Sequence, residues 1–254
     1  RRKTLEVLGD PVKRVEEDPV RMLRAIRFKA KTGFTIEKKL EDAIQKYGQL
    51  LEGTSSERML VEVTKLFTFG HAAKAWSLLS DHQLQAVLFP GLKYVDEKMM
   101  SYYMRFILQT LYNTDNRYVK GQKISSSFLF SVLLWPAWQT KLSAHLKHTK
   151  TSRKSINLQQ AMGYVFKEES KVVAIPKRLQ EAIMIIWQLQ SDFRRKFKQA
   201  NTVVKNPRIR VGYDFLVTLA QIDEALVEQA LKWQPFVEKA QKYAKKSNSK
   251  TTHE

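Results

Sequence analysis

The sequence has 254 residues, of which 43% are apolar, and its 44 Lys and Arg residues against 25 Asp and Glu residues give a formal net charge of +19. The apolar fraction excludes wholesale disorder, and the absence of cysteine excludes disulfides, cysteine-ligated zinc and a cysteine nucleophile. The excess positive charge favours a polyanionic partner, either nucleic acid or an anionic membrane surface, although an inert basic surface is an alternative.

Apolar residues recur with helical spacing along most of the chain, and no run alternates as a strand would, so the predicted fold is all-α. The predicted helices span residues 18–32, 35–47, 59–69, 71–80, 81–89, 97–113, 124–146, 159–166, 176–195, 213–220 and 223–246. Gly33 is expected to end the first helix and Thr35 to cap the second. One of Thr54, Ser55 and Ser56 is expected to cap the third.

Polar and basic residues 147–154 are predicted to form a loop, and residues 245–254 a frayed tail. Trp135 and Trp138 lie in an apolar run and are predicted to be core residues. The five histidines lack metal-ligand spacing, so no metal site is predicted.

No apolar run approaches the roughly 18 residues of a membrane-spanning helix, so no membrane partner is predicted. The sequence has no visible signal peptide and does not begin with methionine. We therefore expect a cytoplasmic protein, and a chain that is a fragment or a processed product of a longer one.

The most informative segment is a helix with two distinct faces. One face, which should pack inward, consists of Met22, Leu23, Ile26 and Ala30. A second row, with residues three apart, consists of Asp18, Arg21, Arg24 and Arg27. A carboxylate followed by guanidinium groups could bind a nucleotide, because the carboxylate accepts from an exocyclic amino group and the arginines hold a triphosphate. The alternative is a solvated basic face with Asp18 as the helix cap.

This segment resembles the neck motif of the class II nucleotidyltransferases, which include the CCA-adding enzymes and the bacterial poly(A) polymerases. The pattern is Glu-Asp-x-x-Arg at residues 17–21, followed by Met-Leu-Arg-Ala-x-Arg-Phe at residues 22–28. Gly9-Asp10-Pro11 and Arg14 precede it, and Gly33-Phe34 follow it. The resemblance implies that ATP is a substrate. It places Asp18 and Arg21 at the base and Arg24 at the phosphates, with Arg14 and Arg27 in the same site.

Residues 56–62 resemble the next neck element of that superfamily, in which an Arg and a Glu lie one helical turn apart. Here they are Arg58 and Glu62, and the spacing predicts an i,i+4 pair that braces the nucleotide-binding helix. An ordinary surface ion pair is the alternative.

The C-terminal part resembles the bacterial poly(A) polymerases more than the CCA-adding enzymes. The matching segments are residues 174–178, 186–190 and 206–216, together with Trp233. The resemblance covers most of residues 5–240 and implies a neck at residues 1–92, followed by a helical body and a basic RNA-binding tail at residues 93–254.

Catalysis in this superfamily uses an Asp-x-Asp pair and a third Asp, which bind Mg²⁺ on a head domain that precedes the neck. No two aspartates of this sequence are two residues apart. We therefore expect the catalytic residues upstream of Arg1, on an N-terminal head domain that would be a partner of this chain and would bind Mg²⁺. The chain alone should be inactive, whereas the parent protein would be a polynucleotide adenylyltransferase.

Basic residues that could bind RNA form two clusters. The first contains Lys147, Lys150, Arg153 and Lys154, and the second contains Arg194, Arg195, Lys196, Lys198, Lys205, Arg208 and Arg210. Phe193, Phe197 and Tyr213 are interleaved with the second cluster, which is typical of sequence-tolerant single-strand binding by charge neutralisation and stacking. The alternative is a solvated helix face with the aromatic residues in the core.

The predicted function is therefore the neck, body and tail of a template-independent poly(A) polymerase, which adds AMP from ATP to RNA 3′ ends. Two alternatives remain: the same part of a CCA-adding enzyme, and a stand-alone helical RNA-binding module.

Overall fold

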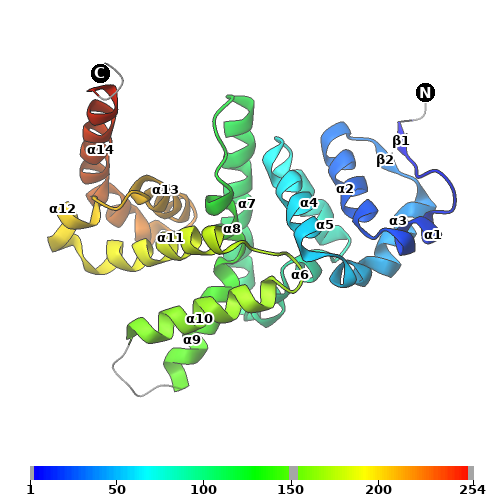
Figure 1. Cartoon of the computed structure of the whole chain (residues 1–254), viewed down its shortest axis with the longest axis horizontal. Coiled ribbons are helices and arrows are strands. Elements are labelled where there is room, and N and C mark those ends of the chain that lie inside the picture. Colours follow the sequence, from blue (N-terminus) through cyan, green and yellow to red (C-terminus); the bar gives the residue numbers. More distant parts are fainter. Residues whose placement is uncertain (1–2, 149–153, 251–254) are drawn as a thin grey trace.

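The computed structural model describes residues 3–148 and 154–250, and almost all of this part of the chain is helical. The helices form an elongated arrangement, with β1 and α14 at opposite ends of its long axis (Figure 1). The all-α prediction is therefore confirmed.

The N-terminal half contains two short strands and a series of short helices. They are β1 (Thr4–Leu5), α1 (Pro11–Glu17), α2 (Val20–Thr32), β2 (Thr35–Ile36), α3 (Lys38–Tyr47), the 3₁₀ helix η1 (Gly48–Gly53), α4 (Ser56–Thr68), α5 (Ala72–Asp81), α6 (Gln85–Leu88) and the 3₁₀ helix η2 (Pro90–Tyr94). Helix α2 packs against both α4 and α5.

The C-terminal half begins with the long helix α7 (Glu97–Val119), which stands at the centre of the molecule (Figure 1). The remaining elements are α8 (Ser126–Leu133), α9 (Trp135–His148), α10 (Lys154–Glu169), α11 (Lys177–Arg195), η3 (Phe197–Gln199), α12 (Ala200–Val203), α13 (Ile209–Ala220), η4 (Glu224–Leu226) and α14 (Val227–Lys250). Helix α11 packs against α8 and α13, so it links the centre of the molecule to its C-terminal end.

The structure corrects the expected helix at residues 35–47 and the expected absence of strands. Thr35 does not cap a helix, because β2 pairs in parallel with β1, with Thr4 opposite Thr35. Helix α3 begins only at Lys38. Two-residue strands are too short to show the alternation by which strands are recognised in a sequence.

Other helix boundaries also differ from the predictions. The single helix expected at residues 124–146 is two helices, α8 and α9, which meet at Leu134. Helix α7 runs on to Val119, and α14 continues through Lys250. The loop predicted at residues 147–154 falls mostly on residues 149–153, outside the described residues.

Two of the predicted helix signals are confirmed. Gly33 follows α2 with a left-handed φ of 72°, and its N–H donates to the Lys29 carbonyl. Ser55 caps α4, because its hydroxyl accepts a hydrogen bond from the Arg58 N–H at 3.4 Å.

The buried apolar residues form a large cluster from Val15 to Leu219 and a smaller one around Trp233. Trp138 and Trp187 stack with ring centroids 4.8 Å apart in the larger cluster. Trp135 and Trp138 are both buried, as predicted. The large cluster includes residues on both sides of position 92, and the neck–body boundary there stays a prediction.

Candidate functional site

Helix α2 carries the nucleotide-site candidates on a firmly packed support. Its inward face, formed by Met22, Leu23, Ile26 and Ala30, is buried as the spacing predicts. Helix α1 starts just before it, where the Asp10 carboxylate caps α1 by accepting from the Val12 N–H at 3.0 Å. The turn between these two helices places Asp18 immediately before α2.

Asp18 lies between two arginines. Its Oδ2 atom accepts a hydrogen bond from Arg58 Nη2 at 2.9 Å and lies 3.7 Å from Arg21 Nε. Its Oδ1 atom is buried and has no hydrogen-bond partner among the described residues. Since buried polar atoms are normally paired, this oxygen is a candidate acceptor for a ligand group.

The structure corrects the expected pair between Arg58 and Glu62. Within the described residues each reaches a different partner: Arg58 bonds Asp18, whereas Glu62 lies 3.8 Å from Arg27 and 2.9 Å from Lys65. Arg58 thus connects α4 to the residue that ends α1, and Glu62 connects α4 to α2, so both contacts are tertiary. The i,i+4 rule considers only one helix, so it could not have indicated these partners.

Arg14 holds the chain before α1 in place. Its Nε atom donates to the Leu8 carbonyl at 2.9 Å, and its Nη1 atom bonds Glu17 at 2.9 Å. Gly9, which the guanidinium of Arg14 flanks, has a φ of 92° that favours glycine. Arg14 therefore shapes the loop that covers one side of α2.

Three of the five candidates line a cavity of about 440 Å³ on this side of α2. They are Arg14, Arg21 and Arg24, and the walls also include Leu5, Glu6, Val7, Leu8, Ala25, Phe28 and Leu40. The β1–β2 pairing, which the sequence did not reveal, holds the segment that forms part of this wall. Positive charge beside apolar surface suits a ligand with an anionic end and a flat apolar end.

The other two candidates do not line that cavity. Asp18 is turned toward α4 through its contact with Arg58. Arg27 faces Glu62 and lies over the Phe28 ring, with 5.1 Å from its guanidinium carbon to the ring centroid. The row predicted at intervals of three therefore splits, because 300° per three residues turns the row around the helix.

The second basic cluster runs from the end of α11 to the start of α13, and nearly all of it is exposed. Two of its members are paired: Lys196 with Asp192 at 3.0 Å, and Arg210 with Asp214 at 2.8 Å. For the others no ion pair is found within the described residues, and these are Arg194, Arg195, Lys198, Lys205 and Arg208.

The stacking role suggested for two aromatic residues of this cluster is not compatible with the structure. Phe193 is buried against Trp233, and Tyr213 is buried with its hydroxyl donating to the Ala230 carbonyl at 3.0 Å. Phe197, by contrast, is 44% exposed. The alternation of basic and aromatic residues here mostly reflects helix packing.

The first basic cluster cannot be placed in the same way. Lys150 and Arg153 lie outside the described residues, and the side chains of Lys147 and Lys154 are not described. Arg208 and Arg210 instead line a large cavity together with four basic residues that we did not single out as RNA-binding candidates in the sequence. They are Arg117 on α7, Lys120 and Lys123 in the turn that follows α7, and Arg178 on α11. Arg117, Lys120 and Lys123 are close in the sequence, but Arg178 and the residues near position 210 are far downstream, so no local pattern marks them as one site.

The catalytic carboxylates expected upstream of Arg1 are not tested by the structure, because Arg1 itself lies outside the described residues. Their place on a preceding head domain stays a prediction. Among the residues that the structure describes, no group of three or more His, Asp or Glu side chains is arranged to hold a metal ion. Nor is any described helix both long enough and apolar enough to cross a membrane.

Two family models match the chain. The one described as "Probable RNA and SrmB- binding site of polymerase A" matches residues 33–95, and "Polymerase A arginine-rich C-terminus" matches residues 150–254.

Among curated proteins, the chain is 34% identical over 233 residues to Poly(A) polymerase I of Escherichia coli O157:H7, covering 90% of this chain and 50% of that protein. It is 33% identical over 231 residues to Poly(A) polymerase I of Haemophilus influenzae, covering 90% of this chain and 51% of that protein. A CCA-adding enzyme of Anoxybacillus flavithermus is 39% identical over 88 residues, which cover 35% of this chain and 22% of that enzyme. The chain thus spans about half the length of the polymerases that it matches, and it is homologous to the C-terminal part of the bacterial poly(A) polymerases.

Proposed function

We propose that this chain is the nucleotide-selecting neck and the RNA-binding body and tail of a template-independent poly(A) polymerase. The enzyme would transfer AMP from ATP to RNA 3′ ends in the cytoplasm, as a step in RNA processing and decay. The similarity to Poly(A) polymerase I over 90% of the chain supports this proposal.

The proposal that this chain binds the nucleotide rests on Asp18 Oδ1, which has no hydrogen-bond partner among the described residues. Asp18 Oδ2 is held by Arg58, while the buried Oδ1 accepts no hydrogen bond from the described residues. The amino group of adenine could supply the missing donor, once the base displaces the surroundings of Oδ1. A base lacking that donor would leave the buried oxygen unpaired, which is how a protein site discriminates strongly between similar ligands.

The phosphates would bind to the arginines that line the neighbouring cavity. Arg24 is exposed and makes no ion pair within the described residues, so its guanidinium is available for two parallel hydrogen bonds to a phosphate. Arg21 lies between the cavity and Asp18 and could contact both ends of the nucleotide.

Phosphoryl transfer needs divalent metal ions held by clustered carboxylates. The described residues offer no such cluster, so they do not fit the Mg²⁺ that the reaction requires. We propose that a separate catalytic head domain binds Mg²⁺, and that this chain contributes binding and base selection.

The experiment that tests the proposal is calorimetric titration of the chain with ATP and with CTP. Asp18→Asn with Arg21→Ala should weaken ATP binding by about 10- to 100-fold, the range expected for lost hydrogen bonds to charged groups. A matched control is Lys38→Ala with Asp42→Ala, which removes an exposed ion pair on α3 and should leave binding unchanged.

The outcomes separate the candidate functions. Equal ATP binding by the Asp18 variant and the unaltered chain would refute the site. CTP binding as tight as ATP binding would favour a CCA-adding enzyme, to which residues of this chain are also similar. RNA binding without any ATP binding would favour a stand-alone RNA-binding module.

A further inference from the structure

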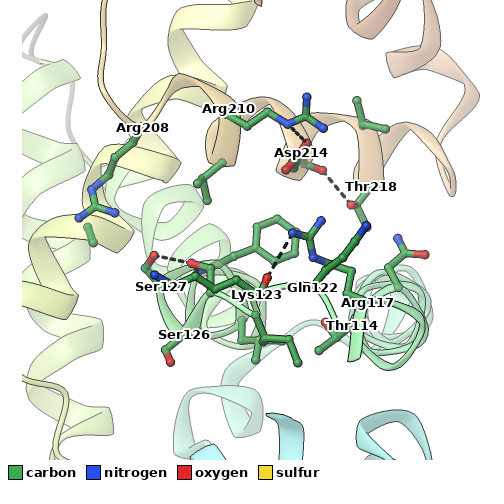
Figure 2. A pocket seen from close by; sticks show the side chains of 18 of the residues that line it. Thr114, Arg117, Gln122, Lys123, Ser126, Ser127, Arg208, Arg210, Asp214 and Thr218 are labelled. Atoms are coloured by element: carbon green, nitrogen blue, oxygen red, sulfur yellow. Dashed lines mark hydrogen bonds and ion pairs between the residues drawn. The ribbon is translucent and has the colours of Figure 1, made fainter. Parts of the chain in front are cut away.

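A second and larger cavity, of about 1130 Å³, opens where α7, α8, α11 and α13 meet. Figure 2 shows side chains from these helices pointing into a common space, with Arg210 and Asp214 on one side and Arg117 with Lys123 on the other. Pockets for drug-sized ligands have volumes of about 300–1,000 Å³. This cavity therefore has room for an extended ligand.

The lining is strongly basic. Its positively charged residues are Arg117, Lys120, Lys123, Arg178, Arg208 and Arg210. Asp214 is the one acidic residue among those that line the cavity, and it is bonded to Arg210 at 2.8 Å. Five positive charges remain uncompensated within the lining, so the cavity favours an anionic ligand.

The rest of the lining suits nucleotides in particular. Hydroxyl groups come from three consecutive serines, Ser125, Ser126 and Ser127, and the apolar lining residues are more buried than the exposed lysines and Arg178. Apolar lining residues include Ile124, Phe128, Leu179, Val211 and Val217. A basic rim with an apolar floor can neutralise phosphates while sheltering bases from water.

The two family models cover only part of this cavity. One wall, at residues 113–129, lies between the regions matched by the models, which are residues 33–95 and 150–254. The other wall, at residues 176–221, lies within the second of these regions. Among its basic residues, the sequence analysis predicted only Arg208 and Arg210 to bind RNA.

We propose that this cavity binds a short stretch of single-stranded RNA, upstream of the 3′ end that receives AMP. The inference rests on the proposed function, which supplies RNA as the substrate. Lys120, Lys123 and Arg178 contact phosphates at the rim, and unstacked bases enter toward the apolar floor. An RNA duplex does not suit this geometry, because its bases are stacked and paired and cannot reach that floor.

The first test compares two double variants that each remove one Lys and one Arg. Lys123→Ala with Arg178→Ala changes two exposed rim residues from different walls of the cavity. The control, Lys98→Ala with Arg105→Ala, changes two exposed residues of α7 that do not line it. Arg117 is left intact because its guanidinium bonds the Lys123 carbonyl at 3.2 Å and fixes the turn after α7.

Binding of a fluorescent oligoadenylate is measured across a salt series. The rim variant should bind about tenfold more weakly at low salt, and its slope of log Kd against log salt should fall by about 1.4, because each single-strand phosphate contact contributes about 0.7. The control should retain both values. Equal losses in the two variants would overturn the proposal, since they would reflect net charge alone.

The second test locates the bound strand without removing any charge. Because the chain contains no cysteine, Gln122→Cys introduces a single thiol at the cavity and Ser101→Cys a single thiol on an exposed part of α7 away from it. Oligoadenylate should slow maleimide labelling of the first thiol and leave the second unaffected. Protection by ATP but not by oligoadenylate would overturn the RNA assignment in favour of a free nucleotide.

The failure of this inference can be told apart from the failure of the proposed function. If the chain binds RNA and the Asp18 variant loses ATP, but the rim variant binds RNA normally, then the cavity assignment alone is wrong. If the unaltered chain binds no RNA, both are wrong.

Discussion

Glu169, the last residue of α10, is a carboxyl group buried in the core. It is 1% exposed, its Oε1 accepts a hydrogen bond from the Gly91 N–H at 2.9 Å, and its Oε2 has no partner among the described residues. Burial raises the pKa of Glu169 from 4.5 to about 8, against the lowering effect of the Gly91 hydrogen bond. The folded protein therefore holds this group protonated at neutral pH.

The sign of the effect on stability follows from proton linkage. Between pH 4.5 and about 8 the folded state keeps a proton that the unfolded state has lost, so the free energy of unfolding falls as pH rises. At about 1.4 kcal/mol per unit, the total loss across this window is about 5 kcal/mol. That is comparable with the whole stability of many domains, about 5–15 kcal/mol.

The perturbation is Glu169→Gln, because an amide has the shape of the protonated carboxyl group and cannot ionise. Its carbonyl oxygen can still accept from Gly91. We expect the variant and the unaltered protein to be similar in stability at pH 5. The free energy of unfolding of the variant, minus that of the unaltered protein, should then rise by about 1.4 kcal/mol for each pH unit up to about pH 8.

The assay is urea unfolding at half-unit intervals from pH 5 to 9, followed by tryptophan fluorescence. Burial lowers the pKa of His82, so His82 opposes the trend by destabilising the fold as pH falls. That contribution is common to both proteins and cancels in their difference. Parallel stability curves over pH 5–8 would refute the reasoning, because Glu169 would then be ionised in the folded state.

Three further substitutions test the packing of the fold, each by the free energy of unfolding in urea. Trp187→Ala should cost about 3–5 kcal/mol, the range for deleting a large buried aromatic side chain, since Trp187 is fully buried and its indole N–H donates to the Ser131 carbonyl at 2.9 Å. Asp115→Ala should cost about 1–3 kcal/mol, because the Asp115 carboxylate accepts hydrogen bonds from two N–H groups at the start of α5, at 2.7 and 3.1 Å. Asp115→Asn keeps one acceptor oxygen and should cost less. Gly212→Ala should cost about 1–3 kcal/mol by overpacking, since the added methyl group would lie 2.5 Å from Leu189 Cδ1. For each of the three positions, an unchanged free energy of unfolding would contradict the contact described.

Some of the candidate site was predictable because it depends on one helix. The apolar spacing of Met22, Leu23 and Ile26 determines which face of α2 is buried, and the same period puts the arginines on other faces. Gly33 ends the helix for an equally local reason, since a left-handed φ favours glycine. The neck resemblance was available at the same level, as a contiguous pattern.

The partners of those residues were not predictable. Arg58 and Glu62 suggested a pair within α4, yet Arg58 reaches Asp18, 40 positions earlier. The choice depends on how α4 packs against α2, and a helical period carries no information about that packing. The roles of Phe193 and Tyr213 were undetermined for the same reason, because burial depends on which helices cover them.

By itself the sequence determined the helical class, the buried face of α2, the basic charge and the similarity to the bacterial poly(A) polymerases, since each is a property of composition or of a short contiguous pattern. Only the tertiary structure decided the β1–β2 pair, the contacts between Asp18 and Arg58, and the basic cavity. The cavity joins residues near position 117 to residues near position 210, and the free energy that brings them together comes from burying apolar side chains elsewhere in the core.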